Sequence, residues 1–355
     1  MNSKNCFVIG VMSGTSLDGI DFVYVKFDRS KLEDFKILYS KTVSYSYEWK
    51  KKLQKAISFS DLELKELDVD YGILLGEKIT DFINEFKITD IDFIASHGHT
   101  ILHQPDKGIT LQIGDGQIIS NIIKQKVVCD FRSQDVAFGG QGAPLVPVGD
   151  KLLFSNFDAC LNLGGFANVS FEENNQRIAF DICPVNIVLN YYVSKLGFSF
   201  DDKGKNASIG EVNESLLLEL NSLLFYKQNP PKSLGLEWVK KEVFPLINKY
   251  HIDEKDVLRT FVEHIAFQLA NNIDNNVKVL VTGGGAFNEF LISRIMFFSK
   301  AEIIIPSKEI VEFKEALVFA FLGLLRVDNQ VNCLKSVTGA KKDHSSGVIF
   351  NPKEF

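Results

Sequence analysis

The sequence has few of the features that mark disulfide-rich, zinc-stabilised or membrane proteins. Its five cysteines are odd in number and none belongs to a Cys-x-x-Cys pair, which argues against a disulfide framework and a structural zinc site. The most apolar stretch, residues 316–325, is about half of the roughly 20 apolar residues that a membrane helix needs. The apolar run at residues 7–12 is too short for a secretory signal. We therefore expect a soluble, cytoplasmic protein of a reducing compartment, with no membrane partner.

Excess positive charge is also missing. The 45 acidic residues outnumber the 39 basic ones and give a net charge of −6. Without a basic footprint we expect no nucleic-acid partner. Neither the P-loop pattern nor the dinucleotide fingerprint occurs, which disfavours those two nucleotide folds. The 355 residues, 45% of them hydrophobic, are nevertheless enough to form two or three domains with a sizeable core.

The order of predicted elements repeats between the two halves of the chain. In the first half, strand-like runs at residues 7–12, 20–27 and 35–45 precede a helix at 62–86 whose apolar residues recur every three or four positions. The second half again opens with strands joined by tight turns and continues with helices and strands. This plan predicts a duplicated α/β fold of two lobes that clamp a ligand.

We place the two lobes from this repeated order, because no Pro/Ser-rich linker marks the join. The N-terminal lobe is predicted at residues 1–150, with residues 328–355 as a candidate segment to complete it. The C-terminal lobe is predicted at residues 151–327.

Two kinds of glycine-containing turn are candidates for binding a nucleotide. The turn at residues 12–21 combines glycines with Ser and Thr hydroxyls, which suit phosphate oxygens, and its Asp18 and Asp21 suit Mg²⁺ held through water. The turns at 162–168 and 282–288 each follow a strand, and their glycines let a phosphate or flat ligand lie against bare backbone. The alternatives are an ordinary hairpin turn and a tight strand–helix crossing.

Polar residues of the first half are candidates for binding a small polar ligand. Residues 96–103 contain three histidines, a spacing that suits a metal, but no acidic residue or Cys lies in that run and we expect no tightly bound transition metal. Arg132 is a planar donor suited to a carboxylate, and Asp115 and Gln141 are typical hydroxyl-binding residues. The alternative is that Arg132 pairs with Asp130 on the surface.

Asp181 is the candidate general base. It is predicted to end a strand at residues 177–182, just before a helix opened by Pro184. A helix N-terminus would keep its pKa low and the carboxylate ready to accept a proton. The alternative is a structural N-cap.

Several of these segments are motifs that occur together and in order. They include Met-Ser-Gly-Thr-Ser-Leu-Asp-Gly at 12–19, Gly-Gly-Gln-Gly-Ala-Pro-Leu-Val-Pro at 139–147, Gly-Gly-Gly-Ala-Phe-Asn at 283–288 and Ser-Val-Thr-Gly-Ala at 336–340. With them, the chain resembles the anhydro-N-acetylmuramic acid kinase family over almost its whole length. The resemblance implies a duplicated two-lobed actin/hexokinase-like (ribonuclease H-like) ATPase fold with a central cleft.

The resemblance also implies a reaction. ATP and Mg²⁺ are used to open the 1,6-anhydro ring of the muramic sugar with water and to phosphorylate O6, which gives N-acetylmuramate 6-phosphate for cell-wall recycling. The family further suggests a homodimer. Two alternatives stay open: a related sugar kinase without ring opening, and a non-catalytic actin-like nucleotide binder.

Site residues follow from the resemblance and from residue type. By the resemblance, Asp181 is the base that activates the attacking water. The residues expected to bind the nucleotide are Gly14, Thr15, Ser16, Leu17, Asp18, Gly19, Ile20, Asp21, Gly164, Gly165, Asn168, Gly283, Gly284 and Gly285. The residues expected to bind the sugar, inferred from residue type and, for Glu315, from a family acidic position, are His97, Asp115, Arg132, Gln141, Gly142 and Glu315.

The chain departs from the family pattern beside the predicted base. The family usually has Asp-Thr-Gly-Pro-Gly-Asn where this chain has Asp-Ile-Cys-Pro-Val-Asn at residues 181–186. Asn190, His99 and Leu236 also differ from the residues that are common at their positions. Because two glycines are lost, close backbone approach at 181–186 is restricted, and we predict a divergent but active branch.

Overall fold

The chain divides into two compact units. The computed structural model describes residues 4–14 and 17–353. The first unit consists of Met1–Ser155 with Phe313–Phe355, and the second is Asn156–Glu312. The second join therefore lies earlier than residue 327, because most of helix α13 (Lys308–Val327) belongs to the first unit.

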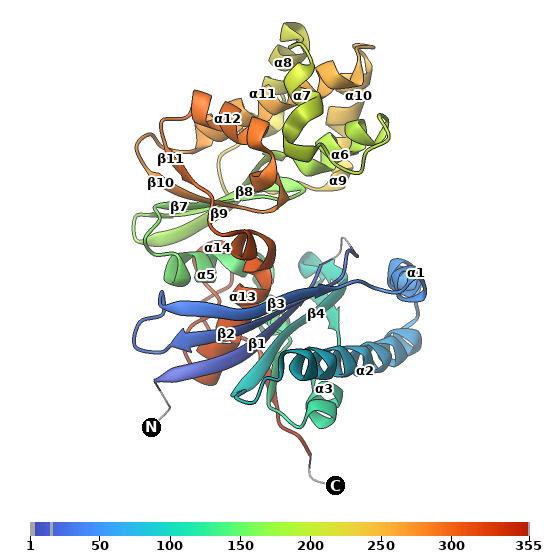
Figure 1. Ribbon diagram of the computed structural model, residues 1–355, viewed down its shortest axis with the longest axis vertical. Helices are drawn as coiled ribbons and strands as arrows, with labels where there is room; N and C mark the ends of the chain where they lie inside the picture. Colours follow the sequence, from blue (N-terminus) through green and yellow to red (C-terminus); the bar gives the residue numbers. More distant parts are fainter. Residues whose placement is uncertain (1–3, 15–16, 354–355) are drawn as a thin grey trace. The chain divides into compact units, whose positions relative to one another are not determined.

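The first unit is built on a seven-stranded sheet (Figure 1) with the order β12-β6-β4-β1-β2-β3, in which β5 also pairs with β4. β1 and β2 form an antiparallel hairpin that β3 extends, whereas β4 runs parallel to β1 and β6 parallel to β4. The strands are β1 (Asn5–Ser13), β2 (Ile20–Asp28), β3 (Phe35–Val43), β4 (Phe93–Gln104), β5 (Ile109–Ile113), β6 (Val127–Cys129) and β12 (Val348–Phe350).

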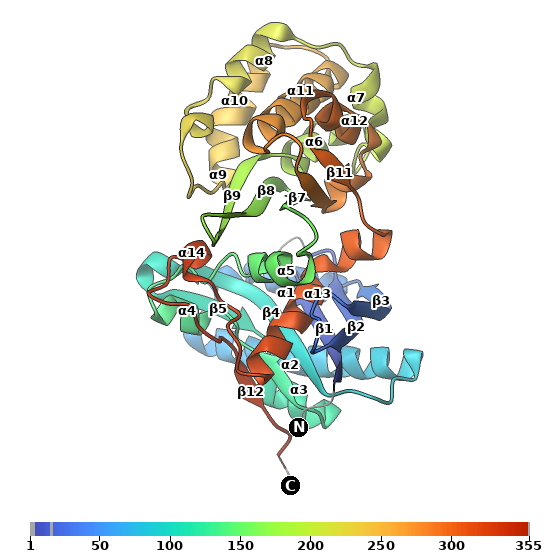
Figure 2. The same ribbon diagram turned by 90° about the vertical axis from the view of Figure 1, so that its left-hand side faces the viewer.

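Alternate residues of β1 face different helices. Ile9 and Val11 share a buried core with apolar residues of α2 (Asp61–Phe86), including Tyr71. Gly10 faces the other way, where a Cβ atom would lie 2.2 Å from the carbonyl oxygen of Ala316 in α13. Helices α2 and α13 therefore cover opposite faces of this sheet (Figure 2), and glycine at position 10 allows α13 to approach the strand closely.

The second unit repeats the order of the first. Its five-stranded sheet has the order β11-β10-β7-β8-β9. β7, β8 and β9 are antiparallel neighbours, and β10 and β11 add to the other side of β7 in parallel. Each sheet thus has three antiparallel strands followed by parallel ones, which confirms the predicted duplicated α/β fold. The strands are β7 (Ala159–Leu163), β8 (Phe166–Glu173), β9 (Gln176–Pro184), β10 (Lys278–Thr282) and β11 (Glu302–Ile304).

Helices of the second unit pack against its sheet. Phe261, Ile265 and Leu269 of α11 pack in one core with Leu161 of β7. The helices of this unit are α6 (Asn186–Ser194), α7 (Lys205–Ile209), α8 (Glu214–Asn221), α9 (Leu236–Trp238), α10 (Phe244–Asn248), α11 (Glu254–Asn272) and α12 (Glu289–Phe298). The first unit adds α1 (Tyr47–Lys55), α3 (Gly116–Ile123), α4 (Ser133–Ala137), α5 (Val146–Leu153) and α14 (Lys335–Thr338).

Two expectations about composition can be compared with the structure. All five cysteines are buried, and none of them forms a disulfide. Across the described ranges, no helix is both long and apolar enough to span a bilayer.

Candidate functional site

The turn between β1 and β2 contains the predicted phosphate-binding residues. Asp18 is exposed, and Asp21 is half-buried and accepts a hydrogen bond of 2.5 Å from the Thr42 hydroxyl. Gly19 has a structural reason to be glycine, because a Cβ atom would lie 2.7 Å from the carbonyl oxygen of Val43. Thr15 and Ser16 lie outside the described residues.

Ser13, at the start of this turn, has a structural role. Its buried hydroxyl donates to the carbonyl oxygen of Gly98 (2.8 Å) and accepts from the hydroxyl of Tyr71 (2.9 Å). These two bonds tie the end of β1 to β4 and α2. The predicted phosphate contacts of the turn therefore have to come from other residues.

The three histidines of residues 96–103 do not form one site. His97 packs against Phe319 of α13, with 4.5 Å between ring centres, whereas His99 packs against Tyr71 of α2. Residues two apart in a regular strand share a face, but Gly98 between them has a φ of +72° and breaks the alternation. The histidines lie within β4 rather than at a strand end, and His97 and His99 face opposite sides of the sheet.

Arg132 connects two of the predicted sugar-binding residues. Its Nε donates to Nε2 of His97 (3.0 Å), and its Nη1 donates to the carbonyl oxygen of Gly142 (2.6 Å). Nδ1 of His97 lies 2.9 Å from the carbonyl oxygen of Gly98, to which it donates. Burial, reinforced by the Arg132 charge, lowers the pKa of His97 well below its usual value. His97 is therefore a neutral, buried acceptor that orients the guanidinium.

The alternative pairing of Arg132 with Asp130 is wrong. Asp130 instead accepts a hydrogen bond from the backbone N–H of Ser133 (3.2 Å) at the start of α4. Glu315, an exposed residue of α13, interacts electrostatically with Arg132 and also with Asp21. An acidic residue of α13 thus links the surroundings of Arg132 to those of the β1–β2 turn.

The two remaining predicted sugar-binding residues differ in their surroundings. The side chain of Gln141 is exposed, and its backbone N–H donates to the carbonyl oxygen of Thr338 (2.8 Å). Asp115 is the N-cap of α3, and its carboxylate accepts from the backbone N–H of Ile118 (2.9 Å). Asp115 therefore has a structural role at the start of α3, which its residue type alone did not indicate.

In the second unit, the glycines of the two predicted turns differ in what surrounds them. Gly283 has a φ of +82°, and a Cβ atom there would lie 2.5 Å from Oδ1 of Asn162. A Cβ atom on Gly285 would lie 2.7 Å from that of Leu163. Gly165 and Gly284 are different, because the nearest atoms to a Cβ there are 3.9 and 3.7 Å away. Gly283 and Gly285 therefore allow the two turns to pack closely, whereas Gly165 and Gly284 leave space beside the backbone.

Asp181 lies inside β9, and this corrects its predicted position at a strand end. β9 continues through Pro184, α6 begins at Asn186, and the N-cap is Val185. Both the N-cap alternative and the expected influence of a helix N-terminus are therefore wrong. The pKa of Asp181 is not low: burial raises it above its ordinary value, opposed by a hydrogen bond from the backbone N–H of Leu234 (2.8 Å).

Neighbours on both sides position Asp181. Asn168 of β8 lies opposite it in the sheet register. On the other side, the backbone N–H of Asp181 donates to the carbonyl oxygen of Lys232 (3.1 Å). The segment 232–234 thus holds both the backbone and the carboxylate of Asp181. None of the residues in this segment, Pro-Pro-Lys-Ser-Leu at 230–234, was among the predicted site residues.

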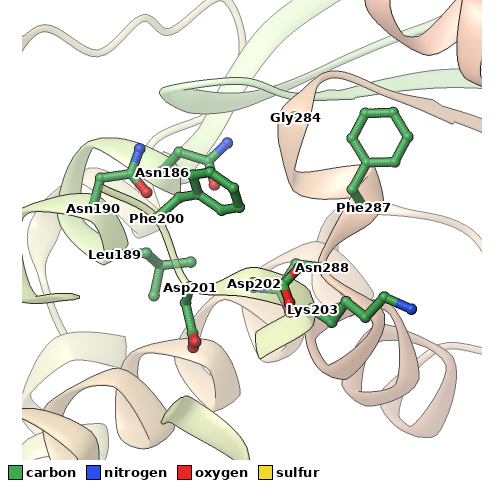
Figure 3. A pocket seen from close by; sticks show the side chains of 10 residues that line it. All are labelled: Asn186, Leu189, Asn190, Phe200, Asp201, Asp202, Lys203, Gly284, Phe287 and Asn288. Atoms are coloured by element: carbon green, nitrogen blue, oxygen red, sulfur yellow. The ribbon is translucent and has the colours of Figure 1, made fainter. Parts of the chain in front are cut away.

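A pocket of about 270 Å³ lies within the second unit beside Gly284 (Figure 3). Phe200 and Phe287 stand on opposite sides of it, and their side chains are 61% and 40% exposed. Asn186 and Asn190 of α6 contribute amide groups. An open pocket with two aromatic rings, amides and a bare backbone suits a flat polar ligand. Neither phenylalanine was predicted, because nothing in the sequence distinguishes an exposed Phe from a buried one.

The repeated sheets, with glycine-containing turns at equivalent corners, define the class of actin/hexokinase-like ATPases. The family model described as anhydro-N-acetylmuramic acid kinase matches residues 6–352. The chain belongs to the anhydro-N-acetylmuramic acid kinase family, a family of ATP-using phosphotransferases, which confirms the resemblance inferred from the motifs.

The relatives match along nearly their whole length. The anhydro-N-acetylmuramic acid kinase of Mannheimia succiniciproducens is 33% identical over 372 residues, covering 97% of this chain and 98% of the relative. That of Coxiella burnetii is 34% identical over 373 residues, covering 98% of each. Among solved structures, component A of (R)-2-hydroxyglutaryl-CoA dehydratase from Acidaminococcus fermentans has a TM-score of 0.47 at 14% identity, covering 89% of this chain and 96% of that one.

Proposed function

We propose that the chain converts anhydro-N-acetylmuramic acid into N-acetylmuramate 6-phosphate, with ATP as the phosphoryl donor. The full-length match to the family is the observation that carries this proposal. The position of Asp181 supports it, because a half-buried carboxylate held by one backbone N–H keeps an oxygen lone pair for a reacting proton.

In the proposed reaction, the Asp181 carboxylate accepts a proton from water as the water oxygen bonds to C1 of the sugar. The C1–O6 bond breaks, and O6 takes the γ-phosphoryl group as the bond to ADP breaks. Phosphoryl transfer passes through a loose transition state, so the protein mainly positions groups and neutralises charge. A carboxylate whose pKa is raised by burial is a stronger base than an exposed one.

We assign the nucleotide to the glycine turns and the pocket of the second unit. The base would lie between Phe200 and Phe287, where aromatic stacking contributes about 1–3 kcal/mol per base. The backbone at Gly284 and Gly165 leaves space for the rest of the nucleotide. Asp18 and Asp21 of the first unit fit Mg²⁺, since magnesium takes few carboxylates and keeps several waters. When bound, Mg²⁺ would neutralise charge on the phosphates.

We assign the sugar to residues around Arg132. Its planar guanidinium is suited to the lactyl carboxylate of the muramic sugar, and its bonds to His97 and Gly142 hold it in one orientation. Gln141, with its exposed side chain, and Glu315 are the hydroxyl-binding candidates beside it.

The test is to incubate the purified protein with ATP, Mg²⁺ and anhydro-N-acetylmuramic acid in ¹⁸O-labelled water and to analyse the product by mass spectrometry. We expect the sugar to gain one phosphoryl group and one labelled oxygen. Phosphorylation of a non-anhydro sugar without labelled oxygen would instead show a kinase that does not open a ring. Nucleotide binding without sugar-dependent ADP release would show a non-catalytic protein.

The role of Asp181 is tested with Asp181→Asn. We expect turnover to fall about 10²- to 10⁴-fold, the usual contribution of general-base catalysis, while ATP affinity is unchanged. Asp158→Asn is a matched control, because Asp158 also accepts a backbone N–H bond in this unit, from Lys278 (2.7 Å). The control should retain wild-type turnover. Unchanged turnover in Asp181→Asn would remove this residue from the mechanism.

A further inference from the structure

Asp135, Cys333 and His344 form a buried cluster in the first unit, beside Gly142, whose backbone N–H donates to Asp135. Asp135 is in α4, and Cys333 and His344 belong to the C-terminal segment, where they pair in an isolated antiparallel bridge. Their side chains offer a carboxylate oxygen, a sulfur and a ring nitrogen that all lie within 4.8 Å of one another. The exposed fractions are 0%, 1% and 6%, so the cluster is shielded from bulk solvent.

The ring of His344 presents a lone pair to this cluster. Its Nδ1 lies 3.1 Å from the carbonyl oxygen of Lys342, to which it donates. In the neutral tautomer with this bond, Nε2 carries the lone pair of the ring. It has no hydrogen-bond partner and lies 3.5 Å from Oδ1 of Asp135. A buried acceptor that faces a carboxylate is unfavourable unless a proton or a metal cation lies between them.

We propose that Asp135, Cys333 and His344 bind a divalent transition metal of the zinc type. Zinc accepts carboxylate oxygen, thiolate sulfur and imidazole nitrogen in a tetrahedral set. Zn–N and Zn–O bonds of about 2.0–2.1 Å put two such ligand atoms about 3.4 Å apart, close to the observed 3.5 Å between His344 and Asp135. On binding, the Cys333 thiol releases its proton to solvent. A water molecule completes the fourth position.

The surroundings of the cluster match those of known metal ligands. A metal-binding histidine usually donates its other ring N–H to a carbonyl or carboxylate, and a ligating carboxylate is itself hydrogen-bonded. Here His344 donates to Lys342. The Asp135 carboxylate accepts from the Thr338 hydroxyl (2.7 Å) and from the backbone N–H of Gly142 (2.7 Å). The metal would therefore be structural and would fasten the C-terminal segment to α4.

The test measures metal binding by the purified full chain after treatment with a chelator. Co²⁺ is added as a spectroscopic substitute for Zn²⁺, and Zn²⁺ affinity is measured by competition with a chromogenic chelator. We expect one ion per chain and a sulfur-to-cobalt charge-transfer band in the near ultraviolet. Cys333→Ser should abolish the band. His344→Gln should weaken Zn²⁺ binding at least about 10- to 100-fold, the loss that even outer-shell partners cause.

Cys6→Ser is the matched control, because Cys6 is also a buried free cysteine of the first unit. It should bind both ions like the wild type. Melting temperatures measured with and without Zn²⁺ show whether a variant has lost only the metal site or also the fold. Zn²⁺ should raise the melting temperatures of the wild type and of Cys6→Ser, but not those of Cys333→Ser and His344→Gln. A wild-type chain that binds neither ion would overturn the proposal. A band that persists in Cys333→Ser would also overturn it.

Discussion

Arg132 and His97 show how a charged side chain fixes the protonation state of a buried neighbour. Nε2 of His97 accepts from the guanidinium, so a proton on that nitrogen would break the bond and place two positive charges together. Burial and Arg132 both lower the pKa of His97. The imidazole therefore stays neutral through the physiological range, and the orientation of Arg132 does not change with pH there.

Asp181 should control the acid side of the pH profile. A general base is active only when ionised, and burial raises its pKa above the ordinary value of 3.8. Turnover should therefore fall as pH decreases through an apparent pKa above 3.8. The measurement is kcat against pH, with circular dichroism at each pH to confirm the fold. An acid limb that persists unchanged in the residual activity of Asp181→Asn would assign the titration to another group.

The same pKa shift has a consequence for stability. Because the raised folded-state pKa favours the protonated form, ionisation of Asp181 lowers the free energy of unfolding as pH rises through that pKa. Asn is neutral and can still accept the Leu234 N–H bond. Asp181→Asn should therefore melt no lower than the wild type at neutral pH, and its loss of turnover would not reflect unfolding.

At the scale of elements, the turn after β10 contains two kinds of glycine: Gly283 packs against a neighbouring turn, whereas Gly284 faces open space. Gly283→Ala puts a Cβ atom against Asn162 and Leu163 at a φ of +82°, and we expect it to cost more than about 2 kcal/mol in the free energy of unfolding. Gly284→Ala meets no atom closer than 3.7 Å. It should fold normally but raise the Kd for ATP.

The two alanine variants are compared by urea unfolding and by titration with ATP. Each serves as the control for the other, since they are neighbours in the same turn. If Gly284→Ala bound ATP like the wild type, the nucleotide would not approach this backbone. If Gly283→Ala were as stable as the wild type, the close contact with the β7 turn would not matter for folding.

The sequence predicted which elements occur better than where site residues lie within them. The predicted helix at 62–86 agrees with α2 (Asp61–Phe86), because its apolar spacing is a local signal. Asp181 was misplaced because Pro184 was taken as a helix start, whereas it is paired in β9 opposite Phe166. Strand pairing of this kind depends on a partner that is remote in the sequence and leaves no local pattern.

The sequence also did not predict which side chains meet in the folded chain. Asp135 meets Cys333 and His344 because the C-terminal segment returns to α4, and no spacing along the chain indicated this contact. The reverse occurred at His97 and His99, which are close in sequence but are separated by the conformation of Gly98. Spacing along the chain therefore predicts a site only where the backbone is regular.

At the scale of the whole molecule, one unit is formed by a continuous segment of the chain and the other by two segments. The second unit is one continuous segment, Asn156–Glu312, with its own sheet and core. The first unit is discontinuous, because it needs Phe313–Phe355 as well as Met1–Ser155. That later segment supplies fully buried apolar side chains of α13, including Leu317, Phe321 and Leu322, and the edge strand β12.

We expect a different outcome when each unit is produced alone. Residues 156–312 should fold, because a continuous segment retains the strands and helices of its core. Residues 1–155 should not fold, because removing α13 uncovers one face of the sheet around Gly10. Residues 1–155 joined by a short flexible linker to 313–355 are the matched control and should fold. Two-dimensional NMR spectra and thermal melts report the result, and a dispersed spectrum for residues 1–155 alone would show that α13 is dispensable for the first sheet.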